Sequence, residues 1–211
     1  MTKSFKVLSL LLSYPDQALQ AAAPELTSAL DDEALLPARE RRAVGRLLDD
    51  LASADLYDAQ ARYVQLFDRT RSLSLHLFEH VHGEGRERGQ ALVDLAQVYD
   101  DGGFDVVVAE LPDFLPLFLE YLSTRPLPEA RLLLAEPLHI LQALHERLRK
   151  RRSVYAGALA ALVALAQCEA SATEVEALLA QADDEPDDLT ALDRAWEDAP
   201  VTFGPGCGNG G

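Results

Sequence analysis

Apolar residues recur three or four positions apart along most of this 211-residue chain, which is the spacing of one face of an α-helix. Alanine and leucine dominate the apolar part of the sequence. The one run that favours a strand, residues 106–108, is too short to seed a sheet. The pattern therefore predicts an all-α protein built as a helical bundle.

Prolines and capping residues divide this pattern into about eight to nine helices. Asp16 and Asp55 are suited to cap the second and the fourth helix. Pro137 interrupts a long helical pattern and predicts a kink or a break there. The expected helices lie at about residues 3–13, 17–30, 37–51, 56–67, 86–99, 114–122, 128–150 and 153–170, with a short docking helix at 189–196.

A change in composition near the end divides the chain into a helical domain, residues 1–182, and a tail, residues 183–211. Residues 169–198 hold eleven acidic residues and one basic residue, Arg194, and residues 204–211 are rich in glycine. Such a segment cannot bury enough apolar surface to fold alone, so we expect the tail to be mobile. Trp196 is the residue most suited to dock a short part of it.

The charge and the cysteine content limit the partners and the compartment. A net charge of −16 argues against nucleic acid and anionic membranes, and favours a basic partner segment. Cys168 and Cys207 form no paired pattern, which favours a reducing compartment. The apolar run at residues 7–12 is short for a signal peptide, and no run approaches the ~20 apolar residues of a membrane span. We therefore expect a cytoplasmic protein.

Polar and ionisable residues are densest between residues 63 and 90. Tyr63 and Phe67 end one helical pattern, a polar segment follows, and a new helical pattern begins near Arg86. The segment is therefore expected to form a helix, a polar junction and a second helix. Such a junction brings charged and apolar groups together, as a groove for an amphipathic helix requires. Tyr63, Phe67 and Phe114 are expected to provide the hydrophobic floor of that groove.

His76, Glu79 and His80 match the HxxEH pattern of a class of zinc proteases. On one helix face, two such histidines could hold zinc while the glutamate activates water. A third ligand would have to come from elsewhere, and Glu136 and Glu146 are candidates by spacing alone. The favoured interpretation is that these side chains bond across the junction, with no metal, no cofactor and no catalytic residue; a small zinc hydrolase is the alternative.

A basic cluster at residues 147–152 stands out in an acidic protein. Cations at a helix C-terminus interact favourably with the helix dipole, and this is the favoured explanation. A site for a phosphate or an acidic partner is the alternative. The cluster is also placed to pair with the acidic tail of the chain itself.

Four stretches resemble the chaperones of the NarJ type, the delta-subunit assembly factors of respiratory nitrate reductase in the wider NarJ/TorD/DmsD group. They are KVLSLLLSYPD at 6–16, LFDRTRSLSLHLFEHVHGEGRERGQ at 66–90, ELPDFLPLFLE at 110–120 and WEDAPVTF at 196–203. The second is the most specific of them. Gly85, Glu87 and Leu92 depart mildly from the family pattern.

The resemblance implies an all-helical cytoplasmic chaperone that is not an enzyme. Its partner would be the molybdenum-containing catalytic subunit of nitrate reductase, bound through its N-terminal segment. The chaperone would hold that subunit until the molybdenum cofactor and the iron–sulfur clusters are inserted, before membrane assembly. The candidate binding residues are Tyr63, Phe67, Asp68, Arg69, Arg71, His76, Glu79, His80, His82, Glu84, Arg88, Glu110, Asp113 and Phe114.

Overall fold

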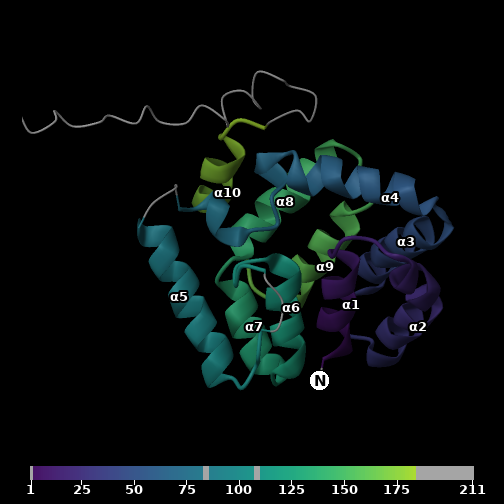
Figure 1. Ribbon diagram of the computed structural model, residues 1–211, viewed down its shortest axis with the longest axis horizontal. Helices are drawn as coiled ribbons and strands as arrows, with labels where there is room; N and C mark the ends of the chain where they lie inside the picture. Colours follow the sequence, from purple (N-terminus) through teal and green to yellow (C-terminus); the bar gives the residue numbers. More distant parts are fainter. Residues whose placement is uncertain (1, 83–85, 107–109, 184–211) are drawn as a thin grey trace, which may run out of the picture.

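The computed structural model describes residues 2–82, 86–106 and 110–183, and within them the protein is all-helical (Figure 1). The predicted fold class is confirmed, with ten α-helices where eight to nine were expected. They are α1 (Lys3–Leu11), α2 (Gln17–Glu33), α3 (Ala38–Ser53), α4 (Leu56–Tyr63), α5 (Arg86–Asp101), α6 (Leu115–Thr124), α7 (Leu127–Ala135), α8 (Leu138–Lys150), α9 (Ala156–Ala166) and α10 (Ala172–Leu179). The short docking helix expected at 189–196 lies outside the described residues.

The helix boundaries follow the predicted capping residues in most places. The Asp16 carboxylate accepts a hydrogen bond from the Leu19 amide at the start of α2, and Asp55 accepts one from the Tyr57 amide at the start of α4. Pro137 breaks the pattern completely, because it separates α7 from α8. Helix α10, capped by Ser171, was not predicted, because its sequence was assigned to the acidic region.

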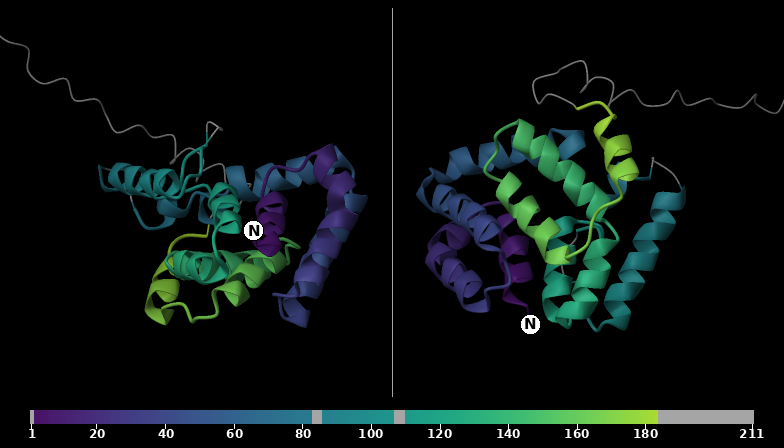
Figure 2. Two further views of the ribbon diagram at one scale, coloured as in Figure 1. Left: turned by 90° about the horizontal axis from the view of Figure 1, so that it is seen from below. Right: turned by 180° about the vertical axis from the view of Figure 1, so that it is seen from behind.

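The core forms where α1 and α9 run through the centre of the bundle. Helix α1 packs between α2 and α6, and α9 packs between α3 and α8 (Figures 1 and 2). Helix α9 is apolar on nearly every side, which is typical of a helix buried in a core. Helix α10 lies against α8.

The polar junction lies between α4 and α5. Helix α4 continues into a π-helical turn, η1 (Val64–Asp68), and two short 3₁₀ helices follow, η2 (Arg71–Leu73) and η3 (Leu77–His80). The chain then pairs with the segment before α6: the Leu77 amide donates to the Asp113 carbonyl (3.0 Å), and the Leu115 amide donates to the Leu75 carbonyl (2.8 Å). The predicted order of helix, junction and helix is therefore correct. Helix α6 begins at Leu115, whose amide makes one of these hydrogen bonds to the junction.

In the described part of the chain, no helix has both the length and the apolar character that a bilayer crossing would need.

Candidate functional site

Asp113 is the buried centre of the polar junction. Its side chain is fully shielded from solvent. One carboxylate oxygen lies 3.2 Å from Nδ1 of His76, and the other accepts a hydrogen bond from the Phe78 amide at 3.0 Å. Burying a carboxylate costs free energy unless its oxygens are hydrogen-bonded. Here the His76 ring and the Phe78 amide, both on the facing segment, supply those hydrogen bonds. Asp113 therefore fixes the shape of the junction and is not placed to touch a ligand.

The three residues of the HxxEH pattern make three separate sets of contacts. His76 lies before η3, outside any helix, and bonds to Asp113. Nε2 of His80 lies 2.8 Å from the Ser74 carbonyl, and Glu79 pairs with Arg88 of α5 at 3.1 Å. The expectation that both histidines share one helix face is wrong, because η3 is a short 3₁₀ helix. Within residues 2–82, 86–106 and 110–183, no three His, Cys, Asp or Glu side chains gather as a metal site.

The two histidines also differ in their electrostatics. The hydrogen bond to Asp113 raises the pKa of half-buried His76, against the opposing effect of burial, and the negative charges of Glu79 and Glu110 add to the rise. Burial lowers the pKa of His80, although its bond to the Ser74 carbonyl acts in the other direction. His76 therefore holds a proton more readily than a free histidine, and His80 less readily.

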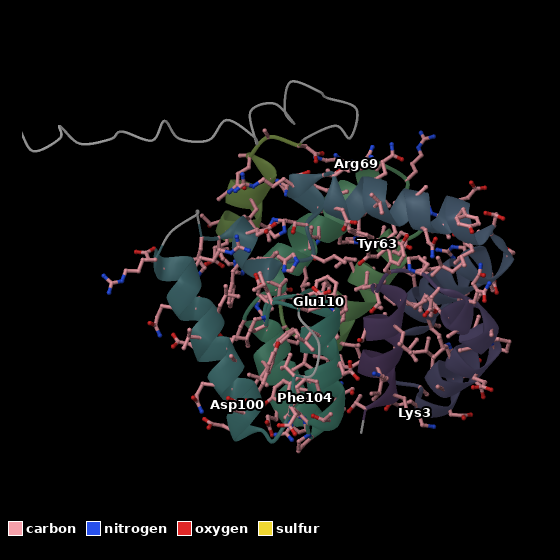
Figure 3. All side chains as sticks on the ribbon, viewed as in Figure 1. Lys3, Tyr63, Arg69, Asp100, Phe104 and Glu110 are labelled. Atoms are coloured by element: carbon pink, nitrogen blue, oxygen red, sulfur yellow. The ribbon has the colours of Figure 1, made fainter. Side chains whose placement is uncertain are left out.

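A cleft of about 500 Å³ opens beside the junction, between α1, η1 and α6. We call it the junction cleft. It is lined by Ser9, Ser13, Tyr14, Tyr63, Asp68, His76, Glu110, Phe114, Pro116, Leu117 and Glu120. Five of the fourteen predicted binding residues therefore come together around one concave site. Two of them, Tyr63 and Glu110, are labelled near the centre of the molecule in Figure 3.

The junction cleft carries negative charge. Asp68 and Glu110 are exposed, and Glu120 pairs with Lys6 at the far side. Burial raises the pKa of Asp68, His76 lowers it, and nearby Glu110 raises it again. Glu110 raises the pKa of Asp68 because the two negative carboxylates repel each other. A cationic group placed between them would relieve that repulsion.

The apolar lining of the cleft differs from the predicted floor of Tyr63, Phe67 and Phe114. The Tyr63 hydroxyl is tied to the Leu12 carbonyl at 2.9 Å, and only 4% of Tyr63 is exposed. Phe67 lies in the core, with its ring 5.1 Å from that of Tyr155, and does not line the cleft. Phe114 is half-buried and its ring lies 5.2 Å from His76. Phe114 is therefore the aromatic side chain of the predicted floor with the most surface to offer.

The remaining predicted residues lie around the junction and not in the cleft. Arg69 and Arg71 are exposed, and Arg69 points outward from the upper edge of the molecule in Figure 3. His82 packs against Phe78, with their rings 5.7 Å apart. Arg88 connects α5 to η3 through Glu79. Glu84 lies outside the described residues.

A second concave surface, which the sequence reasoning missed, lies on the other side of the junction. This apolar groove has a volume of about 500 Å³ and runs between η3, α5 and the start of α8. It is lined by Leu77, Phe78, Val81, Ala91, Asp94, Leu95, Val98, Phe118, Leu133, Glu136, Pro137, His139 and Ile140. The signal that could have found it is the apolar period of α5, in which Ala91, Leu95 and Val98 line the groove and Val98 is exposed.

The basic cluster at the C-terminal end of α8 does more than interact with the helix dipole. Arg147 is buried, and it donates hydrogen bonds to the Ser72 carbonyl (2.8 Å) and the Leu178 carbonyl (2.6 Å). Arg151 pairs with Asp183 at 2.8 Å, and Ser72 also donates to Asp183. These two arginines connect the junction, α8 and α10. The pairing with the start of the acidic tail, which the sequence left open, is therefore present at Asp183.

The chain belongs to a class of all-helical folds that is known from a solved structure. The crystal structure of a protein from Archaeoglobus fulgidus, described there as a redox enzyme maturation protein, matches it with a TM-score of 0.57 and 21% identity, covering 77% of this chain and 91% of the other. Sequence comparison defines the family. Residues 14–161 match the family model described as "Nitrate reductase delta subunit", and the chain belongs to that family.

Relatives with curated names agree with this assignment. The nitrate reductase molybdenum cofactor assembly chaperone NarJ of Escherichia coli K12 is 44% identical over 206 residues, which cover 96% of this chain and 86% of that protein. The nitrate reductase-like protein NarX of Mycobacterium tuberculosis is 32% identical over 154 residues, or 73% of this chain and 23% of that protein. The resemblance found in the sequence is thereby confirmed, and with it the prediction of an assembly-chaperone family and not a hydrolase.

Proposed function

We propose that this protein is a cytoplasmic chaperone that binds the N-terminal segment of the nitrate reductase catalytic subunit. It holds that subunit for insertion of the molybdenum cofactor and the iron–sulfur clusters, before membrane assembly. The name of the Escherichia coli relative supports the chaperone role and the enzyme served. The family match over residues 14–161 supports carrying that role to this chain.

The observation that carries the proposed binding site is the junction cleft. It combines exposed carboxylates, Asp68 and Glu110, with aromatic surface from half-buried Phe114 and exposed Tyr14. An amphipathic basic peptide needs both kinds of surface, since its apolar face must leave water and its cations must meet opposite charge. The net charge of −16 also speeds the encounter with such a peptide.

Two features of the molecule offer competing accounts. The apolar groove beside α5 has the larger apolar surface and could hold the apolar face of the peptide instead. Several junction residues, such as Asp113 and the Glu79–Arg88 pair, serve the fold by connecting separate segments. A useful experiment must therefore alter cleft residues that have no such structural role.

Calorimetry with a synthetic N-terminal peptide of the catalytic subunit tests the proposal. The double variant Asp68→Ala with Glu110→Ala should bind about 2-fold to 30-fold more weakly, since each partly exposed ion pair contributes about 0.2–1 kcal/mol. Raising the salt concentration should weaken the parent more than the variant, because exposed charges are screened beyond ~10 Å at 0.1 M. The control, Asp32→Ala with Glu176→Ala, removes the same charge from exposed sites on α2 and α10.

The outcomes separate the two surfaces. If the control and the cleft variant bind alike, the junction cleft is not the site. If Val98→Asp in the apolar groove abolishes binding while the cleft variant binds like the parent, the groove holds the peptide. If the full-length catalytic subunit does not co-purify with the parent protein at all, the proposed function itself fails.

A further inference from the structure

An arginine-lined cleft of about 640 Å³ lies on the far side of the molecule from the junction cleft, and shares no residue with it. It is formed by α3, α8, the turn after α8 and α9, which Figure 2 shows together in the view from behind. We call it the arginine cleft. Its charged lining consists of Arg39, Glu40, Arg42, Arg46, Arg149 and Arg152. Five of the 19 basic residues of an acidic chain thus converge on one concavity.

Most of these arginines have no ion-pair partner in the part of the chain that the structure describes. Arg149 pairs with Glu146 at 2.7 Å. Among the residues that the structure describes, Arg39, Arg42, Arg46 and Arg152 take part in no side-chain hydrogen bond or ion pair. Other exposed arginines are neutralised, as Arg41 is by Asp31 on the neighbouring face of α3. Five arginines and one carboxylate, Glu40, line the cleft, so positive charge remains in excess and an anion bound between the arginines is stabilised.

The floor of the arginine cleft is apolar and made of small residues. It comprises Ala43, Val154, Ala156, Gly157, Ala160, Val163 and Ala164. His145 also lines the cleft, and its Nδ1 lies 3.0 Å from the Ala156 carbonyl. If Nδ1 carries the hydrogen of that bond, Nε2 is left to face a ligand. Charged side chains beside an apolar lining suit a ligand with an anionic end and a ring, and the volume is that of a small-molecule site.

We propose that the arginine cleft binds a phosphate-bearing small molecule of the nucleoside diphosphate class, with the phosphates on the arginines and the ring on the floor of α9. Planar guanidinium groups match phosphate oxygens in pairs, which makes arginine the residue best suited to this ligand. The basic peptide proposed for the junction cleft is excluded here by like charge. An anionic membrane surface is disfavoured by the net charge of −16.

Calorimetry with pyrophosphate and with ADP at about 0.1 M ionic strength tests the charged rim. The full chain should bind both, and the double variant Arg42→Ala with Arg152→Ala should lose at least tenfold in affinity for both. Its matched control, Lys3→Ala with Arg86→Ala, removes the same charge from exposed sites outside the cleft and should bind like the parent. If both double variants lost affinity equally, the proposed site would be wrong, since the loss would then reflect the net charge of the protein.

The apolar floor is tested separately by Ala160→Leu, which fills the space under the proposed ring. Affinity for ADP should fall at least fivefold while affinity for pyrophosphate stays the same. If neither ligand binds the parent, the proposal is wrong. It is also wrong if a peptide of residues 184–198, the acidic part of the tail, binds a chain truncated after Asp183 more tightly than ADP does. The client peptide experiment is independent, so either proposal can fail alone.

Discussion

His76 and His80 lie four residues apart, but folding changes their affinities for protons in opposite directions. His76 has a folded pKa above its ordinary value of 6.5, so its contribution to stability is complete below pH 6.5 and is lost as pH rises through the raised pKa. His80 has a folded pKa below that value, so its contribution is present above pH 6.5 and is lost as pH falls toward the lowered pKa. The two effects of pH therefore oppose each other in the parent protein.

Single variants should separate these effects. We expect His76→Gln to lower the free energy of unfolding more at pH 5.5 than at pH 8, because the charged bond to Asp113 is lost only where His76 is protonated. We expect His80→Gln to do the reverse. Urea unfolding at both values measures the differences. Equal losses at the two pH values would show that neither histidine titrates in the folded range.

For single residues, the sequence identified which side chains belong to the junction but not which of them are exposed and which serve the fold. Density of charge identified the segment 63–90, and three of its residues, Tyr63, Asp68 and His76, line one cleft together with Glu110 and Phe114. It could not distinguish Asp68, which is exposed, from Asp113, which is buried, because that depends on the pairing of residues 75–77 with 113–115. The burial of Arg147 was missed for the same reason: its acceptors, the Ser72 and Leu178 carbonyls, are far away in sequence.

Two glycines show how closely helices α3 and α9 approach. A Cβ atom on Gly157 of α9 would lie 2.8 Å from the Ala43 carbonyl oxygen of α3, closer than such atoms come in proteins. Gly45, within α3, has nothing within 4 Å of the corresponding position. Gly157→Ala should therefore push the two helices apart and lower the free energy of unfolding by about 1–3 kcal/mol. Gly45→Ala should raise the free energy of unfolding by about 0.5–1 kcal/mol.

Thermal or urea unfolding of the two glycine variants measures this contrast. Both changes add the same methyl group to a helix. The difference between their effects on the free energy of unfolding therefore reports on the contact between α3 and α9. If Gly157→Ala were as stable as Gly45→Ala, α9 would have to be more loosely packed than the structure shows.

Elements with caps and strong periodicity were predictable, and elements defined by distant contacts were not. Asp16 and Asp55 identified the starts of α2 and α4 because capping is local. Helix α10 is a short segment in an acidic stretch, and its position depends on Leu178, whose side chain is buried and whose carbonyl meets Arg147 of α8. The apolar groove was missed because the consecutive elements η3 and α5 form it together with the start of α8, which is distant in sequence.

For the molecule as a whole, we predict that residues 184–211 are dispensable for folding, because their charge and glycine content cannot support a core. Truncation after Asp183 should leave the melting temperature nearly unchanged. Truncation after Ala170, which also removes α10 and Asp183, should lower it clearly, since Arg147 loses its bond to the Leu178 carbonyl and Arg151 loses its pairing with Asp183. Scanning calorimetry compares the two. A large drop for the first truncation would place the domain boundary further along the chain.

The packing of α1 has a consequence for how the protein is made. Phe5, Leu8 and Leu11 are fully buried, and α1 lies mainly against α6, which begins roughly 100 residues later in the chain. At about 5–20 residues per second, the ribosome needs ~5–20 s to add that length. During this interval α1 carries its apolar face without its main partner. A protein proposed to shield a segment of another chain thus emerges with an unshielded helix of its own.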